Sequence, residues 1–283
     1  MKSIAHLITA ILLIFPSAQA QLIQERVPQL EGVGVVEHLG GKIPLDLTFQ
    51  NARGDTVRLA EYFRQGTPVV LSMHYTNCPM LCSLVLNGLA NTVRDMDWRP
   101  GNRFEMVSVS FDPEETPQLA SAVKDRYVAS LGPEAGPDAW HFLVGPEEHS
   151  KALAEALGFQ YKWVPERQEY AHPAVIFVLA GDGTISRYLY GIEFKEQDLR
   201  LALLEASEGK IGNTIDRIIL YCFHYDPEAG SYVVLAGNVM KLGGLATLIL
   251  LGVFLGVLWS RDKVRRAGRE PVREPREETL QDR

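Results

Sequence analysis

The amino-acid sequence predicts an α/β fold in which a central mixed sheet is flanked by helices. First, short apolar runs typical of strands alternate along the chain with segments whose apolar residues recur at helical spacing. Second, the run PVVLSMHY at 68–75 is apolar almost throughout, as in a strand buried on both faces. Third, roughly two hundred residues separate two apolar segments near the chain ends, which is enough for one well-packed domain.

The individual elements follow from turn and capping residues. Two short strands are expected around a turn at Asn51–Gly54. Thr116 and Pro117 are typical of the N-cap and the first position of a helix, and the Gly-Asp-Gly turn at 181–183 predicts a β-hairpin. Further strands are expected at 68–75, 103–111 and 140–145 and a hairpin at 174–191, with helices at 80–96, 116–131, 146–159 and 195–207.

The order of these elements is that of a thioredoxin-like fold with an N-terminal β-hairpin extension. The domain is expected to span residues 41–210. Cys78 and Cys82 lie where the first core strand passes into the first core helix. Open α/β sheets bind their ligands at the carboxyl ends of strands, so the two cysteines are placed where chemistry is expected.

Both ends of the chain carry apolar segments that indicate export and a membrane anchor. Residues 1–20 have the layout of a secretory signal peptide cleaved after Ala20, rather than that of an uncleaved anchor. Leu242–Trp259 has no charged residue and can cross a hydrocarbon core of roughly 30 Å, which favours a membrane span over a buried core helix. The basic stretch 261–269 is expected to stay in the cytoplasm. The expected segments are a signal peptide (1–20), a lead-in (21–40), the domain (41–210), a juxtamembrane segment (211–240), one C-terminal transmembrane helix (241–260) and a disordered, charged cytoplasmic tail (261–283).

This topology predicts a protein of the bacterial inner membrane whose functional domain lies on the periplasmic side. The formal net charge of −7, with no basic cluster outside the tail, argues against nucleic acid as a partner. The chain has only three cysteines, Cys78, Cys82 and Cys222, which excludes a disulfide-rich scaffold. So few cysteines in an oxidising compartment, two of them close together, indicate that the pair is kept for chemistry.

The pair Cys78 and Cys82 could be a structural disulfide, a redox dithiol or two metal ligands. A disulfide here would close a loop of only a few residues and stabilise little. In a helix that includes Cys82, the spacing places both sulfurs on one face. We expect the helix N-terminus to lower the thiol pKa and favour thiolate, which serves both disulfide exchange and copper binding. The spacing, one residue longer than C-x-x-C, favours a metal, and Cu(I) with two thiolates and an imidazole fits better than zinc.

His172 is the expected imidazole ligand. It stands immediately before a buried strand, and in a thioredoxin-like sheet this position faces the helix start that carries the cysteines. Pro173 falls where such folds carry a cis-proline. For His74, at the end of the first core strand, packing in the core is favoured over a supporting role at the site. Met80 is a weak thioether candidate, and Met73 is expected to pack in its strand. The remaining histidines His38, His141 and His149 are expected to be solvated or capping.

The segments YTNCPMLC, VSFDPEETP and HPAVIFVLAGDG together resemble the Sco/SenC family of copper-handling, thioredoxin-like proteins over residues 40–210. Each segment alone is unspecific, but the ordered set is specific. The resemblance implies that Cys78, Cys82 and His172 bind copper, as Cu(I) or Cu(II), and that Asp112 lies close by as a supporting acid. The alternative for Asp112 is a turn acid in FDPEETP.

Family members deliver copper to the binuclear copper centre in cytochrome c oxidase subunit II, or reduce its cysteines. The resemblance therefore implies a membrane-anchored copper chaperone rather than an enzyme, with subunit II or another exported copper protein as its partner. The alternative is a thiol–disulfide reductase in which Cys78 and Cys82 are catalytic. Ser83, where many members have Pro, and Pro173, shared with oxidoreductases, keep that alternative open. A peroxidase-like enzyme and a purely structural module are less well supported.

The segment YCFHYDPEAGSY, at 221–232, is not explained by the resemblance. Cys222 and His224 stand close together just ahead of the apolar segment. A loop at the membrane surface is favoured over a second, partner-facing copper site.

Overall fold

The structure is a computed structural model that describes residues 32–208, 223–226, 231–234 and 236–267. The predicted signal peptide and Cys222 lie outside the described residues, as does the tail beyond residue 267. Compact packing divides the domain into a larger unit, which includes 37–158, and a smaller one formed by 32–36 and 159–173. Each unit is described by itself below.

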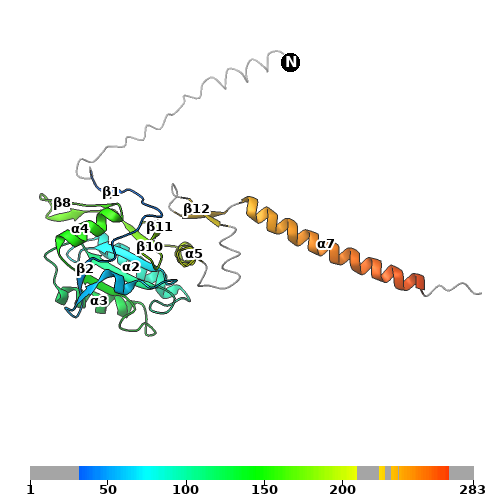
Figure 1. Ribbon diagram of the computed structural model, residues 1–283, viewed down its shortest axis with the longest axis horizontal. Coiled ribbons are helices and arrows are strands. Elements are labelled where there is room, and N and C mark those ends of the chain that lie inside the picture. Colours follow the sequence, from blue (N-terminus) through cyan, green and yellow to red (C-terminus); the bar gives the residue numbers. More distant parts are fainter. Residues whose placement is uncertain (1–31, 209–222, 227–230, 235, 268–283) are drawn as a thin grey trace, which may run out of the picture. The chain divides into compact units, whose positions relative to one another are not determined.

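The larger unit is built on a seven-stranded mixed sheet with the strand order β11-β10-β4-β5-β6-β2-β3. Figure 1 labels β2, β10 and β11 of this sheet. The central strands β4, β5 and β6 are parallel, and the strands on either side of them pair antiparallel. Every residue of β4 and β5 is buried, which explains why these strands read as continuous apolar runs. The strands are β2 (Thr48–Asn51), β3 (Thr56–Arg58), β4 (Val69–His74), β5 (Glu105–Ser110), β6 (His141–Val144), β10 (Val175–Leu179) and β11 (Ile185–Tyr190).

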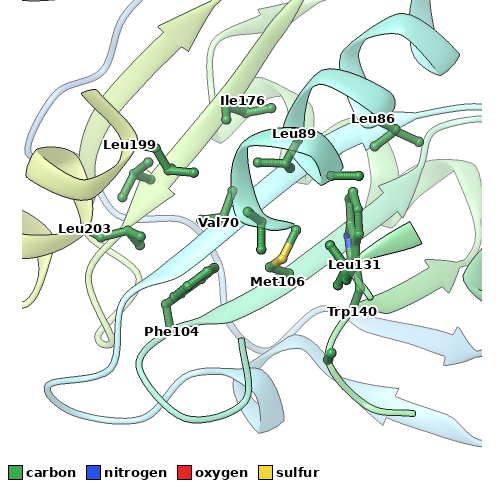
Figure 2. Close-up of a cluster of buried hydrophobic side chains, with 14 of the residues drawn as sticks. Val70, Leu86, Leu89, Phe104, Met106, Leu131, Trp140, Ile176, Leu199 and Leu203 are labelled. Carbon is green, nitrogen blue, oxygen red and sulfur yellow. The ribbon is translucent and has the colours of Figure 1, made fainter. Parts of the chain in front are cut away.

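Helices connect the parallel strands and cover the sheet, as the predicted fold requires. The side chain of Thr116 accepts a hydrogen bond from the N–H of Leu119 at 3.4 Å, and Pro117 opens the helix, which confirms the predicted start of α3. The helices are α2 (Leu81–Asp95), α3 (Pro117–Ser130), α4 (Glu147–Ala156) and α5 (Glu196–Ala206), with a 3₁₀ turn η2 at Leu59–Tyr62. Figure 2 shows part of the core, in which Leu86 and Leu89 of α2 and Leu199 and Leu203 of α5 gather over Val70, Met106 and Ile176 of the sheet.

Two β-hairpins in this unit were predicted from their turns. The predicted β2–β3 hairpin forms, and it extends the main sheet because β2 pairs with β6. The β10–β11 hairpin turns at Asp182 and Gly183, where Gly183 has a φ of +83° that favours glycine. Asp182 accepts the N–H of Thr184 at 3.0 Å, and its carboxylate lies 2.7 Å from Nζ of Lys42.

The smaller unit consists of two short strand pairs that the sequence analysis did not predict. Strand β1 (Gly34–Val35) pairs with β7 (Phe159–Gln160), and β8 (Lys162–Val164) pairs with β9 (Glu169–Ala171). The turn between β8 and β9 contains no glycine. Gln168 takes the left-handed backbone conformation there, with a φ of 52°, so the usual sequence signal of a hairpin is missing.

Toward the C-terminus the described residues form a hairpin and a long helix. The hairpin of β12 (Phe223–Asp226) and β13 (Ser231–Val234) was not predicted, and it includes His224. Helix α7 (Ala236–Ala267) contains an apolar stretch, Met240–Trp259, that is long and apolar enough to cross a membrane. The prediction of disorder is wrong for 261–267, which continue α7, because this stretch has neither Gly nor Pro and is rich in helix-forming Arg and Lys.

Candidate metal centre

Both cysteines lie close to the start of α2, and backbone N–H groups donate hydrogen bonds to both sulfurs. Cys78 lies within the turn between β4 and α2, and Cys82 lies in the first turn of α2. The N–H of Cys82 donates to Sγ of Cys78 at 3.2 Å, and the N–H of Tyr75 donates to Sγ of Cys82 at 3.5 Å. The N-cap residue Met80 makes no side-chain capping bond, so the sulfur of Cys78 satisfies an amide that the start of the helix leaves open.

The donor atoms of Cys78, Cys82 and His172 all lie within 4.8 Å of one another, so the three side chains could hold a metal ion. Among the residues that the structure describes, this is the one such group of His, Cys, Asp and Glu side chains. Cys82 and His172 are buried, and Cys78 is partly exposed. Nδ1 of His172 lies 3.0 Å from the carbonyl oxygen of Pro173. A protonated Nδ1 would donate to that oxygen and leave Nε2 to bind a metal.

Burial governs the acidity of Cys82. Removal from water raises the pKa of the Cys82 thiol far above its ordinary value, and the neighbouring side chain of Cys78 raises it further. The expectation that the helix N-terminus lowers the thiol pKa is therefore wrong for Cys82, because desolvation outweighs the favourable amide and dipole effects. Since a metal binds the deprotonated sulfur, binding here would release the proton that burial otherwise retains.

Glu115, in the acidic stretch after β5, is hydrogen-bonded to the cysteine turn, residues 76–80. Asp112 accepts the N–H of Glu114 at 3.0 Å, the turn bond that was its alternative role, and its place beside a metal stays a prediction. Glu115 is 9% exposed and accepts hydrogen bonds from both the N–H and the hydroxyl of Thr76, the latter at 3.0 Å. Glu115 was not among the site residues predicted from the sequence. The available signal was that β4 and β5 are adjacent, so the turns that follow them meet at one edge of the sheet.

The prediction of a cis peptide bond before Pro173 is wrong, since the peptide bonds within the described residues are trans. Trans is the lower-energy isomer even before proline. Ser83, which stands where many family members have Pro, forms a side-chain hydrogen bond with Tyr127 of α3. Met80 lies between the two cysteines in the chain and is 65% exposed, and a ligand role for its thioether stays a prediction.

The other candidate residues are accounted for by packing. Met73 is buried in β4, as expected. His74 is buried with its ring edge-on to that of Phe142, at 5.4 Å between centroids, in agreement with the packed-core interpretation. Nδ1 of His38 lies 3.0 Å from the carbonyl oxygen of Ala156 and Nδ1 of His149 lies 2.7 Å from that of Thr48, while His141 lies beside Tyr62.

Comparison with protein families identifies this arrangement. The model of the SCO1/SenC family matches residues 40–203, which is more than half of the 283-residue chain. The chain belongs to the SCO1/SenC family. Its three ligand candidates all lie inside the matched range. Among curated proteins, none matches the sequence significantly.

Solved structures resemble this SCO1/SenC chain at low sequence identity. A protein from Aquifex aeolicus VF5, described as an electron transfer protein, is 24% identical over 59% of this chain and 94% of its own, with a TM-score of 0.53. Arabidopsis thaliana ScoI, solved with copper bound, is 20% identical over 60% of this chain and 94% of its own, with a TM-score of 0.42. Bradyrhizobium japonicum ScoI, also with copper bound, is 20% identical over 60% of this chain and 98% of its own, with a TM-score of 0.44. At this identity the Aquifex structure supports the fold alone.

Proposed function

We propose that this protein is a membrane-anchored copper chaperone that assists assembly of the binuclear copper centre of cytochrome c oxidase. The observation that carries the proposal is the group of Cys78, Cys82 and His172 in a chain of the SCO1/SenC family. Two thiolates and one imidazole form a soft donor set that suits Cu(I) and can also hold Cu(II). Copper is the cargo in this proposal, and the partner is subunit II of the oxidase or another exported copper protein.

The unequal exposure of the two sulfurs supports a transfer role. Cys82 is buried and fixes one side of the cargo, whereas Cys78 is partly exposed. A thiolate of the partner can therefore approach copper from the side of Cys78 and replace it as a ligand. As copper leaves, the two sulfurs of this chain take up protons, in the reverse of metal binding.

Helix α7 supports the membrane part of the proposal. Its apolar stretch Met240–Trp259 serves as the single C-terminal span, and the basic residues after it remain in the cytoplasm. The domain at 41–210 then works on the periplasmic side of the bacterial inner membrane, joined to the span by 211–240. Residues 1–20 direct export and are removed.

A thiol–disulfide reductase is the second candidate function, and the geometry of the two sulfurs favours it. The sulfurs of Cys78 and Cys82 are close, and Cys78 is exposed enough to attack a disulfide of the partner. Attack of the Cys78 thiolate on a partner disulfide would form a mixed disulfide, which Cys82 would then break. The partner gains two electrons and leaves with two thiols, and Cys78 and Cys82 end as a disulfide that an exported dithiol reductant must reduce.

Copper binding by the full chain in detergent tests the proposal. We expect the reduced protein to bind copper and the variants Cys78→Ser, Cys82→Ser and His172→Ala to lose it. His149→Ala is the matched control, because its ring contacts a backbone oxygen outside the group. If His172→Ala keeps copper, the ligand set is wrong. If His172→Ala keeps disulfide exchange while unchanged protein does not transfer copper to a binuclear copper domain, the reductase is the better assignment.

A further inference from the structure

We propose that Glu115 is a positioning residue that holds the cysteine turn in its copper-binding geometry. The inference rests on the proposed copper-binding function and assigns a role to a side chain outside the ligand set. It starts from the way two neighbouring turns are joined at the carboxyl edge of the sheet.

The topology brings these turns together. Strands β4 and β5 are parallel and in register, with His74 opposite Ser110, so the segments that follow them leave the sheet side by side. The first leads to the cysteines within a few residues, and the second contains Glu115. A side chain on the second turn can therefore hold the first turn directly.

Glu115 makes this link with both oxygens of its carboxylate. One oxygen accepts the backbone N–H of Thr76, and the other accepts the Thr76 hydroxyl at 3.0 Å. The side chain of Ser110 adds a third hydrogen bond to the carboxylate. Bonds to an ionised acceptor are stronger than neutral ones, and two bonds from one residue also fix its orientation.

The cysteine turn lies outside the regular hydrogen bonding of the strand before it and the helix after it. Residues 76–80 belong to neither β4 nor α2, and the bond from the N–H of Cys78 to the carbonyl oxygen of Tyr75 is long, at 3.4 Å. Thr76 lies two residues before Cys78, so a clamp on Thr76 limits where the Cys78 sulfur can move. Metal ligands must be held within about 0.5 Å of the binding geometry, and supporting hydrogen bonds provide that precision.

The charge of Glu115 gives the clamp a property that a purely structural link would lack. Within the described ranges no ion pair involves Glu115. Its carboxylate accepts the N–H of Thr76, and the N–H of the preceding residue, Tyr75, donates to Sγ of Cys82. A negative charge beside the ligands stabilises Cu(II) relative to Cu(I), so it lowers the reduction potential of bound copper.

The test compares Cu(I) affinity and the Cu(II)/Cu(I) potential of the full chain in detergent, using a chromophoric Cu(I) chelator as competitor. We expect Glu115→Ala to weaken Cu(I) binding by about tenfold or more, the range typical of residues that orient metal ligands. Glu115→Gln keeps the shape and one acceptor, so it should weaken binding less and raise the potential. Thr76→Val removes only the hydroxyl donor and should weaken binding without raising the potential. Glu114→Ala, an exposed neighbour, is the matched control and should change neither.

The outcomes separate this inference from the proposed function. Unchanged protein that binds no copper overturns the proposed function and this inference with it. Copper binding by the unchanged protein, with equal affinity and potential in Glu115→Ala and Glu115→Gln, overturns this inference alone. If Glu115→Ala does not fold, as judged by circular dichroism, the Glu115→Gln and Thr76→Val variants decide the question by the same two measurements.

Discussion

The two ends of β5 each bury a glutamate, and the two carboxylates are stabilised in different ways. At the start of the strand, Glu105 forms an ion pair with Arg64, and its second oxygen lies 3.7 Å from Nε2 of His141. Just beyond the other end, Glu115 is held by the neutral donors of Thr76 and Ser110. Both side chains are almost withdrawn from water, at 5% exposure for Glu105 and 9% for Glu115.

This difference in how the two carboxylates are paired distinguishes an end of β5 that stabilises the fold from an end that lies at the candidate metal centre. A buried carboxylate next to a cation is compensated, and its main effect is to fix the fold. A buried carboxylate among neutral donors keeps its charge available to whatever lies nearby, and such groups gather at functional sites. In this chain the uncompensated glutamate lies at the carboxyl edge of the sheet, where the cysteines are, and where open α/β sheets bind ligands.

The largest expected effect concerns the compensated end. Arg64→Ala leaves the Glu105 carboxylate buried without its cation, so the free energy of unfolding should fall by about 3 kcal/mol, measured by urea denaturation. Arg53→Ala, which removes an exposed ion pair with Asp55, is the control and should change the free energy of unfolding much less, because water screens this pair. Copper affinity should be the same in both variants. A loss of copper binding in Arg64→Ala would contradict the division between the two ends.

A smaller loss is expected from the helix that begins at the cysteine end. Gly88 of α2 packs so closely on the segment that follows β11 that an added Cβ would lie 1.9 Å from the carbonyl oxygen of Ile192. Gly88→Ala should therefore lower the free energy of unfolding by about 2 kcal/mol, as overpacking does. Gly136→Ala meets no atom within 4 Å and should stay within about 0.5 kcal/mol of the unchanged protein. Equal stability of the two variants would show that α2 is free to move.

The pH dependence of stability distinguishes Glu115 from an ordinary acid. Burial raises the pKa of the Glu115 carboxyl above its ordinary value of 4.5. The folded state therefore binds the Glu115 proton more tightly than the unfolded state does. The stability that the protonated carboxyl contributes is present at low pH and is lost as the pH rises above 4.5. In metal-free protein, Glu115→Gln should flatten this fall in stability at pH values above 4.5, as measured by urea unfolding. An identical pH profile in the variant would assign the fall to another group.

The smallest expected effect comes from Asp182 in the exposed turn of the β10–β11 hairpin, whose pKa is lowered, whereas that of Glu115 is raised. The hydrogen bond from Lys42, with those from Thr184, lowers the pKa of Asp182 to about 2 from 3.8. The ionised Asp182 carboxylate therefore stabilises the folded state above pH 3.8, and this contribution is lost as the pH falls toward about 2. Asp182→Asn should remove that contribution, so acid unfolding followed by circular dichroism should show a shallower decline. A decline as steep as in the unchanged protein would mean that the exposed pair is screened by solvent.

Local patterns in the sequence were sufficient for most of the fold. The continuous apolar run of β4, the helical spacing of α2 and the capping residues of α3 each depend on neighbouring residues only, and each was predicted close to its observed bounds. The β8–β9 hairpin was missed because its turn uses Gln168 in place of glycine. The β2–β3 hairpin was predicted, but its pairing with β6 depends on contacts that are distant in the sequence.

At the candidate site, the three metal ligands could be predicted from the sequence, but the residues that surround them could not. The cysteine spacing and the strand after His172 pointed to the group that the structure brings together. Which of three nearby acids turns inward is decided by the path of the chain after β5, so Glu115 could not be told from Asp112 by type. The pKa of Cys82 depends on burial by residues from elsewhere in the chain, and the helix-terminus argument could not include it.

The hydrogen bonds to the two sulfurs have a consequence for how this protein can be altered. Cys78 receives its bond from the amide of Cys82, and Cys82 receives its bond from the amide of Tyr75. Both donors are main-chain groups, and hydrogen bonds to a ligating sulfur help to set the electronic character of a copper–thiolate bond. No side-chain replacement other than proline deletes such a donor. The electron density on these sulfurs is thus set by the path of the backbone, and substitution of the surrounding side chains can leave it unchanged.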